Sequence, residues 1–513
     1  MTPPCGHNGL VNRSISDAAG RSKAGADFLQ LSLGEVPTGG LSTWLAEQLR
    51  AAISDGRLPI GSRLPATRVL AAELQVSRGV VTEAYQRLTE DGHVAGQGRA
   101  GTTVVAAPTS TTPIDHALPS PVSTEAVVGE PGLDIFDAMR AAPARLDLTP
   151  GVPDLAAFPR AAWLKAERTV LADLSAAEFG YGEPAGTPRL RQSVATWLAR
   201  NRGIKADPED LIIVAGVAQA LSLLAQVLRD QGISALAVED PGSLGSRQHL
   251  EHLGMRTIPI PVDSEGLRVD LLHESRARVV LATPAHQFPT GVVLGGERRR
   301  QLIQWAVDGG LIIEDDYDAE HRYDRPPVPA LRAMLTDQVI YTGSVSKLLA
   351  PSLRIGWMLA PPQYRDVLIR AKRLADLGNA SLPQLVLAQL MDSGDLERQL
   401  RYVRRRHRQR RDAIIEAIGT YLPTATVHGA AAGLHLTITF DSPLDDVALA
   451  RAALSLGVKT QPLSWHSQTA RTPGLVLGYA ARTPTELTEA ISTLATALHQ
   501  LPRPPLATHK SAS

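Results

Sequence analysis

Short apolar runs alternate with helix-length segments through the middle of this 513-residue chain, and this alternation limits the folds that the chain can adopt. The runs are rich in β-branched residues and bounded by glycine or proline, so we expect buried strands with helices between them. Strands joined in this way form a mostly parallel sheet with helices on both faces, the core of an α/β domain. The expected strands are LIIV at 211, SALAVED at 234, RVVLATP at 278, GLIIEDD at 310, QVIYTGS at 338 and IGWMLAP at 355.

The chain holds 52 Lys plus Arg and 52 Asp plus Glu, so its net charge neither supports nor opposes a nucleic-acid partner. Its one cysteine, Cys5, excludes an intrachain disulfide framework and a cysteine-based zinc site, and we predict no metal. The stretch 211–228 is uncharged, but its glycine and polar residues fit a strand running into a helix better than a membrane span. We therefore expect a soluble, cytoplasmic protein of two or three domains with no membrane contact.

Helical periodicity begins at Leu41, where apolar residues recur at spacings of three and four until Asp55 and Gly56 end the pattern. A second helix is expected from Pro65, because proline costs no hydrogen bond in a first helical turn. After a short turn, a third helix is expected with Ser77 as its N-cap. Two helices joined by so short a turn predict a helix-turn-helix.

The segment from His93 to Val105 contains three glycines among β-prone residues, which predicts a tight hairpin, or wing. Four arginines and only one acid, Glu73, lie from Arg57 to Arg78. Such an arginine excess suits contact with phosphates and guanine edges. The periodicity alone is also compatible with a small three-helix module that binds protein rather than DNA.

The segment SRLPATRVLAAELQVSRGVVTEAYQRLTEDGHVAGQGRAGTTV resembles the GntR-type winged helix-turn-helix along its whole length. The resemblance implies that double-stranded DNA is contacted at the start of the second helix, at the start of the recognition helix and by the wing. Some relatives carry an arginine at the position of Thr82, so that contact is not expected here. The residues implied to contact DNA are Arg68, Ser77, Arg78, Arg99 and Gly101.

Proline, threonine, serine and alanine dominate the segment that follows the wing, and no periodicity is visible there. Such a segment does not bury enough apolar surface to repay its ordering entropy, so we expect a flexible linker rather than a proline-rich docking motif. The predicted organisation is a flexible leader at 1–38, a DNA-binding domain at 39–106, the linker at 107–140, the α/β domain at 141–502 and a disordered tail at 503–513.

The segment GSVSKLLAPSLRIGW, which begins at Gly343, follows an expected strand. A lysine at such a strand end can present its amine in a desolvated pocket, where a lowered pKa allows Schiff-base formation. A surface lysine at a helix start is the alternative interpretation of Lys347. Hydroxyls and a guanidinium beside Lys347 would suit a phosphate, and they belong to Ser344, Ser346 and Arg354.

The segment IIEDDYDAE places acids at the end of an apolar strand, where they are costly unless a cation pairs with them. A protonated pyridine nitrogen is such a cation; Asp315 would hold it, and Tyr317 could hydrogen-bond the ring's phenolate oxygen. Helix capping or a magnesium site is the alternative role for these acids. Upstream, VAGVAQALSLL begins a helix directly after a strand, which suits a phosphate dianion.

The motifs YGEPAGTPRLR, GVAQAL, TPAHQFPTG, EDDYDAE and TGSVSKLLAPSLRIGW occur in the order found in fold type I aminotransferases, which residues 141–502 resemble. Behind a GntR-type winged helix, such a domain is typical of the MocR/GabR regulators. The resemblance implies pyridoxal 5'-phosphate (PLP), bound as an internal aldimine on Lys347 with Asp315 at the pyridine nitrogen and Tyr317 at the ring oxygen. It also implies a homodimer, usually head-to-tail, in which Tyr181 reaches the other subunit's phosphate. The other implied phosphate contacts are Ala218, Gln219, Ser344, Ser346 and Arg354.

Two positions depart from the aminotransferase pattern. Ser243 stands where an aromatic residue often stacks on the pyridine ring, and Val476 where many aminotransferases carry the substrate-carboxylate arginine. Neither change removes a group needed to capture PLP. We therefore expect a transcription regulator that senses PLP, a small amine or an amino acid and binds repeated DNA half-sites, with transamination at most a residual half-reaction. Genes of vitamin B6 or amino-acid metabolism are the expected targets, and an active aminotransferase with a fused DNA-binding module is the alternative.

Seven arginines lie from Arg401 to Arg411 in a helical context. They would suit a second, sequence-independent contact with DNA. A solvated helix face or a dimer-interface network is the alternative, and we favour it.

Overall fold

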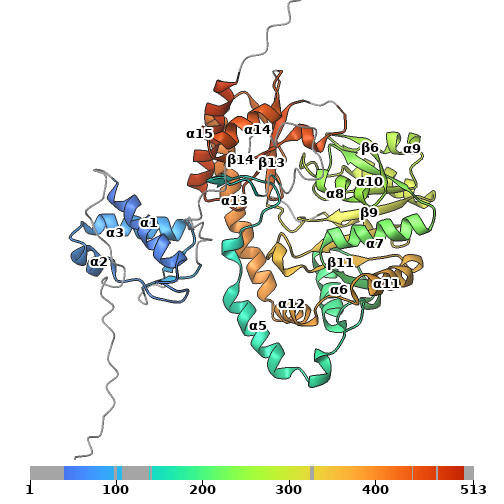
Figure 1. Ribbon diagram of the computed structural model, residues 1–513, viewed down its shortest axis with the longest axis horizontal. Helices are drawn as coiled ribbons and strands as arrows, with labels where there is room; N and C mark the ends of the chain where they lie inside the picture. The colour runs from blue at the N-terminus through green and yellow to red at the C-terminus, as the bar shows by residue number, and fades with distance from the viewer. Residues whose placement is uncertain are drawn as a thin grey trace, which may run out of the picture. The chain divides into compact units, whose positions relative to one another are not determined.

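The chain divides into two compact units, residues 1–112 and 113–513, and Figure 1 colours the chain from blue to red along its length. The expected leader, the expected tail and most of the expected linker lie outside the described residues. No helix in the part of the chain that the structure describes is long and apolar enough to cross a membrane. The computed structural model describes residues 40–96, 101–106, 138, 141–323, 328–441, 443–469 and 472–501.

The first unit contains three helices and a short hairpin. Helix α1 packs Leu45 and Leu49 against Val81 and Leu88 of α3, and all four side chains are fully buried. In the hairpin, Val94 lies opposite Val104. The predicted helix-turn-helix and wing are therefore confirmed. The elements are α1 (Leu41–Ser54), α2 (Thr67–Glu73), α3 (Arg78–Glu90), β1 (Val94–Gly96) and β2 (Thr102–Val104).

The start of α2 differs from the prediction. The helix begins at Thr67, and Ala66, with an extended backbone, is its N-cap. Pro65 therefore precedes the helix, and its carbonyl accepts a hydrogen bond from the Tyr85 hydroxyl at 2.9 Å. The expectation that Pro65 lies in the first turn is wrong, because the chain is still extended there to meet α3. The predicted cap of α3 is present, since Ser77 Oγ accepts from the Val80 amide at 3.4 Å.

An eight-stranded sheet forms the centre of the second unit, in the order β4-β11-β10-β9-β8-β5-β6-β7. The strands from β10 to β6 in this order are parallel, whereas β11 is antiparallel to both of its neighbours. All six expected strands are present, and the predicted mostly parallel sheet is confirmed. The strands are β4 (Leu211–Val214), β5 (Ala235–Asp240), β6 (Arg256–Asp263), β7 (Gly266–Leu267), β8 (Val279–Ala282), β9 (Leu311–Asp316), β10 (Val339–Ser344) and β11 (Gly356–Leu359).

Helices cover both faces of this sheet, which is why its strands are apolar throughout. In β4, Ile213 belongs to one apolar core with α6, and Ile212 to another core with α7. The uncharged stretch 211–228 is thus β4 followed by α7, as expected. The helices are α5 (Arg160–Asp173), α6 (Pro188–Arg202), α7 (Val217–Asp230), α8 (Leu244–His252), α9 (Val269–Glu274), α10 (Gly296–Val307), α11 (Pro362–Asp376) and α12 (Ser381–Asp392).

A smaller antiparallel sheet follows the long helix α13 (Asp395–Tyr421), which Figure 1 draws in orange. Its strand order is β12-β13-β16-β15, and α14 and α15 share its apolar core. The sequence analysis did not predict this sheet, because its strands lie outside the series of apolar runs that alternate with helices in the middle of the chain. Its elements, with the paired strands β3 and β14, are β3 (Leu146–Asp147), β12 (Ala425–His428), β13 (His435–Phe440), α14 (Asp446–Ser455), β14 (Val458–Lys459), β15 (Gln461–Pro462), β16 (Gly474–Gly478) and α15 (Pro484–Gln500).

Candidate functional site

Lys347 lies just beyond the end of β10, and its amine is directed inward. Its Nζ donates a hydrogen bond to the carbonyl of Gly151 at 2.5 Å. A side chain at position 151 would bring its Cβ to 3.0 Å from that Nζ, so glycine keeps the space around the amine open. Burial lowers the pKa of Lys347, although Asp318 and Asp315 oppose the shift. This placement fits an amine held for chemistry better than a solvated surface lysine.

The acids at the end of β9 alternate between the two faces of the strand. Glu314 accepts hydrogen bonds from the amides of Leu331 and Arg332 at 2.9 and 3.0 Å, so it caps a short helix. Asp316 accepts from Arg202 Nε and from the Tyr341 hydroxyl, both at 2.5 Å. Capping thus explains Glu314, and a buried ion pair explains Asp316. Both oxygens of Glu314 are thus engaged, whereas the Oδ1 of Asp316 is buried and has no hydrogen-bond partner among the described residues.

Asp315, between them, points to the other face. Its Oδ1 is buried and has no hydrogen-bond partner among the described residues. Burial and the nearby carboxylates of Asp316 and Asp318 raise the pKa of Asp315 to about 7, while Lys347 partly opposes this shift. A buried carboxyl with a free oxygen is costly unless a donor or cation arrives to satisfy it. Asp315 lines a cavity together with Val238, Glu239, Gly242, Ser243, Ser246, Arg247, Leu281, Thr283 and Phe288.

The start of α7 and the turn after β10 together make a polar cradle that would suit an anion. Gly216, the N-cap of α7, has a φ of 85°, and a Cβ there would lie 3.3 Å from Nη1 of Arg354. Arg354 is itself left-handed, with a φ of 51°, and its Nη2 donates to the carbonyl of Ala215. Exposed Ala218 lies in the first turn of α7, whose amides have no acceptor within the helix. Ser344 and Ser346 stand at the other side, linked by a 3.4 Å hydrogen bond from the Ser346 amide to Ser344 Oγ.

Gln219 differs from the other predicted phosphate contacts. Its side-chain oxygen accepts from the Ala215 amide at 2.7 Å and from Lys372 Nζ at 3.2 Å. Its Nε2 donates to Asp376 Oδ2 at 2.6 Å. The Gln219 amide side chain is therefore committed to the Ala215 amide and to a network with α11. This geometry does not support a side-chain contact with a phosphate.

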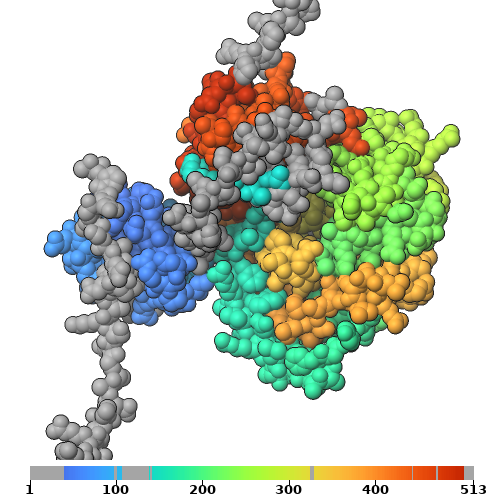
Figure 2. Space-filling model, viewed as in Figure 1, coloured from blue at the N-terminus to red at the C-terminus, as the bar shows by residue number. Residues whose placement is uncertain are grey.

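Tyr181 lies on the surface of the second unit. Its side chain is 94% exposed, and that of Phe179 is 64% exposed. Figure 2 shows the segment after α5, in teal, on the surface of the second unit. A hollow beside Tyr181 is lined by residues that include Leu377, Gly378 and Leu385. A single chain thus leaves an aromatic surface uncovered here.

The two departures from the aminotransferase pattern occupy different places. Ser243 caps α8, accepting from the Ser246 amide at 3.2 Å, and lines the cavity beside Asp315. Val476 is fully buried in β16, opposite Thr437 and Gln461. No aromatic side chain therefore comes from position 243, and no cation from position 476.

Phe288 and Glu239 are among the cavity residues that the sequence analysis did not single out. Phe288, within TPAHQFPTG, lines the cavity, and its ring centroid lies 4.9 Å from that of His435. Glu239 ends the β5 run SALAVED, and burial raises its pKa to about 7. The Thr283 hydroxyl donates to Glu239 at 2.5 Å. Glu239, like Asp315, is an acid at the end of an apolar strand, so the same argument would have identified it. Nothing in the sequence marked Phe288 except its place in the motif TPAHQFPTG.

The predicted DNA contacts of the first unit lie on its surface. Arg68 in the first turn of α2, and Ser77 and Arg78 at the start of α3, are exposed. Neither Arg68 nor Arg78 has an ion-pair partner among the described residues. Thr82 is also exposed, one turn after Arg78. Arg99 lies outside the described residues.

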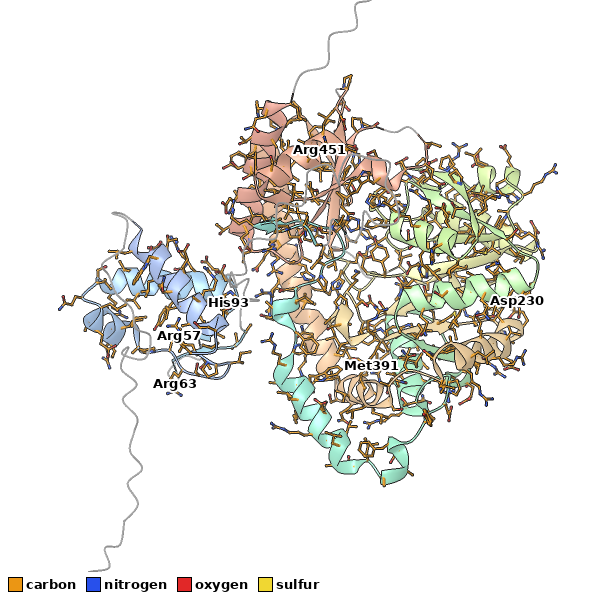
Figure 3. The ribbon with its side chains drawn as sticks, in the orientation of Figure 1. Arg57, Arg63, His93, Asp230, Met391 and Arg451 are labelled. Carbon is orange, nitrogen blue, oxygen red and sulfur yellow. The ribbon has the colours of Figure 1, made fainter. Side chains whose placement is uncertain are left out.

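The wing brings one further arginine into view. Gly101 has a φ of 92°, and a Cβ there would lie 3.5 Å from the Arg63 side chain. Arg63 pairs with Thr103 of the hairpin through an isolated bridge and is exposed. Figure 3 labels Arg63 together with Arg57, which forms an ion pair with Asp55. Arg63 therefore joins the candidate DNA surface, whereas the side chain of Arg57 already has a partner.

The arginine-rich segment of α13 has two sides. Arg406 and Arg410 both bind Asp154 at 2.7 Å, while Arg404 and Arg411 donate to the carbonyls of Arg322 and Ala430. These four arginines therefore hold α13 in the fold. The exposed arginines follow one helical face at spacings of four and three and are Arg401, Arg405 and Arg408.

Comparison with known proteins agrees with this geometry. Residues 145–494 match the family "Aminotransferase class I and II", whose domains typically bind PLP, and residues 41–104 match "Bacterial regulatory proteins, gntR family". Kynurenine aminotransferase from Pyrococcus horikoshii superposes with a TM-score of 0.66 at 26% identity, over 71% of this chain and 93% of that chain. A DNA-binding winged helix and an aminotransferase fold together define a class of transcription regulator.

Two full-length relatives place the chain within that class. It is 32% identical to "Probable rhizopine catabolism regulatory protein MocR" of Rhizobium meliloti, over 88% of this chain and 92% of that protein. It is 33% identical to "HTH-type pyridoxine biosynthesis transcriptional regulator PdxR" of Corynebacterium glutamicum, over 86% and 92%. The chain belongs to the MocR-type transcription regulators, which join a GntR-type DNA-binding unit to an aminotransferase-like domain.

Proposed function

We propose that this regulator captures PLP at Lys347 and that occupancy of the site controls operator binding, with little or no catalytic turnover. The observation that carries the proposal is the unpartnered, buried Oδ1 of Asp315 in the cavity. PLP supplies an aldehyde, which a neutral lysine amine captures with release of water, and a ring nitrogen that can carry a proton. The residues around the cavity fit that group.

Each predicted contact has a physical reason to bind PLP. The lowered pKa of Lys347 favours the neutral, nucleophilic amine. Asp315 would hold the protonated ring nitrogen, which would return a partner to its carboxylate. Tyr317 would contact the ring oxygen. Arg354, Ser344, Ser346 and the first-turn amide of Ala218 would hold the phosphate, because a helix N-terminus and a guanidinium both favour a dianion.

The proposed assembly is a homodimer, with a head-to-tail arrangement of the DNA-binding units. The exposed Tyr181 and Phe179 support it, since a contiguous aromatic surface on a single chain is typical of an interface. In the dimer, Tyr181 of one protomer would reach the phosphate site of its partner. Two DNA-binding units would then occupy repeated half-sites of an operator.

The proposed effector is free PLP, with a small amine or amino acid that condenses with bound PLP as the alternative. A relative that is named for pyridoxine biosynthesis supports control of vitamin B6 genes. An effector can shift a regulator between two conformations only if it binds one of them more tightly than the other. Covalent capture together with the phosphate contacts would give PLP a large difference in affinity between the two conformations.

The test is an operator titration of PLP-free protein, PLP-loaded protein and Lys347→Ala at one fixed salt concentration. We expect PLP to change the affinity or footprint of the wild type and to leave Lys347→Ala unchanged. Lys205→Ala, which removes an exposed lysine, is the matched control and should respond like the wild type. The same affinity and footprint in every sample would contradict control by PLP.

A working aminotransferase is the second candidate. Similarity to "Aromatic-amino-acid aminotransferase 1" of Thermococcus litoralis, at 29% identity over 62% of this chain, favours it. Val476 argues against it, because a buried valine cannot pair with a substrate carboxylate. Release of a keto acid from an amino donor over many turnovers would place this function first.

A further inference from the structure

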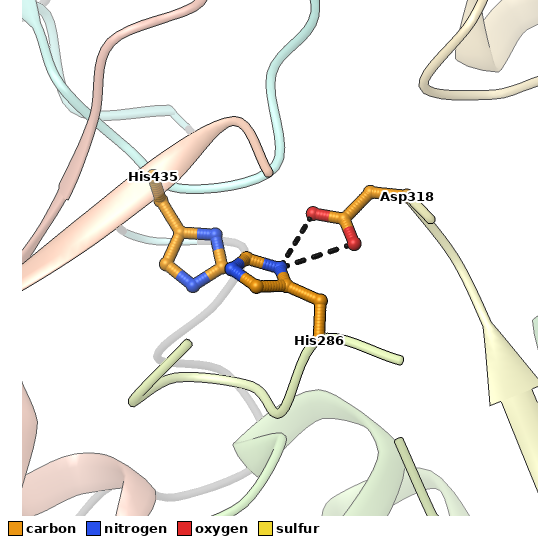
Figure 4. A group of neighbouring side chains, drawn as sticks. All are labelled: His286, Asp318 and His435. Atoms are coloured by element: carbon orange, nitrogen blue, oxygen red, sulfur yellow. Dashed lines mark hydrogen bonds and ion pairs between the residues drawn. The ribbon is translucent and has the colours of Figure 1, made fainter. Parts of the chain in front are cut away.

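Two buried side chains, His286 and Asp318, meet the partly buried Tyr317 close to Asp315 in the sequence. Nδ1 of His286 lies 3.1 and 3.0 Å from the two carboxylate oxygens of Asp318, and 3.0 Å from the hydroxyl of Tyr317. Figure 4 shows the His286 ring facing Asp318, with the ring of His435 beside it. His286 is 2% exposed and Asp318 is 1% exposed. The group is therefore sheltered from water.

The His286 ring is held in one position by the backbone around it. A Cβ on Gly433 would come within 2.0 Å of the imidazole Cε1 and 2.8 Å of Asp318 Oδ2. A Cβ on Gly291, on another side, would lie 3.1 Å from Nε2 of the ring. Glycine at both positions leaves a slot of the ring's own size. The ring consequently has little freedom to turn Nδ1 away from its two partners.

The hydrogen bonds allow one consistent assignment of protons. An ionised Asp318 only accepts, so Nδ1 of His286 must carry the hydrogen that joins them. An Nδ1 that carries a hydrogen has no lone pair to offer Tyr317. The Tyr317 oxygen can then accept a bifurcated hydrogen bond from Nδ1, so the Tyr317 O–H must donate to another group. Burial, followed by the charges of Asp318 and Asp315, holds the pKa of Tyr317 well above its ordinary value, so the hydroxyl keeps its proton.

Neighbouring groups do not supply an alternative acceptor or a competing charge at Nδ1. Nε2 of His435 donates a hydrogen bond to the Pro289 carbonyl at 3.2 Å, and burial lowers the pKa of His435 to about 3, so its ring is neutral. Burial likewise lowers the pKa of His321 to about 4. The other ionisable groups facing Tyr317 are Asp315, Glu239 and Tyr479. The ring of His435 completes a set of side chains that could hold a metal ion. Hydrogen bonds engage Nδ1 of His286 and Nε2 of His435, whereas Nε2 of His286 is buried and has no hydrogen-bond partner among the described residues.

We propose that His286, held by Asp318, is a positioning residue that turns the Tyr317 hydroxyl into a hydrogen-bond donor toward the ring oxygen of PLP. This inference rests on the proposed function, since it concerns the same site. It adds a role that the sequence motif TPAHQFPTG did not reveal. His286 acts through Tyr317 and needs no contact with the cofactor.

The test follows the visible absorption band of PLP bound to full-length protein as a function of pH. A donor at the ring oxygen withdraws negative charge that would otherwise retain a proton on the neighbouring nitrogen. Tyr317→Phe should therefore raise the midpoint of the band's titration by about one pH unit, a tenfold change in proton affinity. His286→Phe should also raise the midpoint of the titration, because Tyr317 is then free to donate its hydrogen bond to Asp318 instead of to the ring oxygen. His286→Asn, whose amide nitrogen can replace Nδ1, should restore a midpoint close to that of the wild type.

The double variant Tyr317→Phe/His286→Phe separates positioning from a general effect of packing. If His286 acts through Tyr317, the double variant has the midpoint of Tyr317→Phe alone. Full additivity of the two single shifts, or a His286→Phe midpoint equal to that of the wild type, would overturn the inference. Absence of a visible band in the wild type would instead refute PLP capture, so the two failures are distinguishable.

Discussion

Arg78 in the first unit is exposed and has no ion-pair partner among the described residues, whereas Lys347 in the second unit keeps its amine against the carbonyl of Gly151. The candidate DNA-binding surface thus presents solvent-exposed positive charges, which suit a long, highly charged polymer. The cavity around Asp315 instead holds desolvated groups with shifted pKa values. If the proposed function holds, the chain binds DNA through exposed groups and a small molecule through buried groups, and the two surfaces should respond differently to substitution.

The largest effect is expected at the buried amine. Lys347→Ala should abolish the visible band of protein-bound PLP, because no other lysine among the described residues follows a strand end with hydroxyls, a guanidinium and a buried carboxyl nearby. Absorbance spectra after removal of free PLP provide the measurement, with Lys205→Ala as control. A band that persists in Lys347→Ala would mean that another lysine captures the cofactor.

The second effect is expected at a buried ion pair that takes no part in the proposed ligand site. Arg202 and Asp316 form an ion pair in which both side chains are 1% exposed. Arg202→Ala leaves the buried carboxylate without its partner and should lower the unfolding free energy of the second unit by about 3–5 kcal/mol. Arg300→Ala breaks an exposed pair with Glu297 and should cost less than about 1 kcal/mol. Equal costs in urea unfolding would remove the distinction between buried and exposed charge.

The third effect concerns exposure. Arg78→Ala should weaken specific operator binding by about 1–3 kcal/mol through loss of a base-edge or phosphate contact. Because the side chain is exposed, the unfolding free energy should hardly change. Gln86→Ala, at an exposed site on the same helix, is the control. Unchanged affinity for a genomic operator would show that α3 does not dock as assigned.

The fourth effect follows from the raised pKa of Asp315. The native carboxyl titrates near 7, above the value of about 3.9 in an unfolded chain. The unfolded state therefore loses this proton first, so the free energy of unfolding falls as pH rises from about 4 to 7. In PLP-free protein above pH 7, Asp315→Asn should be more stable than the wild type by about 1–2 kcal/mol.

The same change should weaken PLP binding, which opposes its effect on stability. Glu239 and Glu314, whose pKa values are also raised to about 7, lose stability in the same pH window. The difference in unfolding free energy between Asp315→Asn and the wild type, measured at pH 5 and at pH 8, reports on Asp315 alone, because Glu239 and Glu314 are present in both proteins. An unchanged difference at the two pH values would contradict the assignment.

The smallest effect is expected at a helix cap. Ser77→Ala removes the acceptor for the Val80 amide and should destabilise the first unit by about 1 kcal/mol. Ser77→Asn keeps an acceptor at the N-cap and should retain most of the stability. Thermal unfolding of the two variants decides the question, and equal midpoints would indicate that the cap contributes little.

The sequence predicted local features well, because each depends on neighbouring residues. Ser77 as an N-cap and the β9 run before Asp315 followed from patterns a few residues long. The Arg202–Asp316 pair, 114 residues apart, and the His286–Asp318 contact, 32 residues apart, depend on tertiary packing. No periodicity encodes such contacts.

Two differences at the site have the same origin. Gln219 was expected to contact a phosphate, but its side chain meets Lys372 and Asp376, which come from α11 much later in the chain. Phe288 lines the cavity because the turn after β8 reaches the end of β5 and β9. In both cases the identity of the residue was visible in the sequence, and the direction of its side chain was not.

Glu314, Asp315 and Asp316 alternate between the two faces of β9, and this alternation limits where insertions and deletions can occur in the family. Successive side chains of a strand point to opposite faces, so a one-residue insertion or deletion within β9 would exchange them. Asp315 would then turn toward Arg202, and the carboxyl that pairs with Arg202 in this structure would point into the cavity. We therefore expect natural variants to alter effector preference by substitution around the cavity, while insertions and deletions accumulate in surface loops and spare this strand.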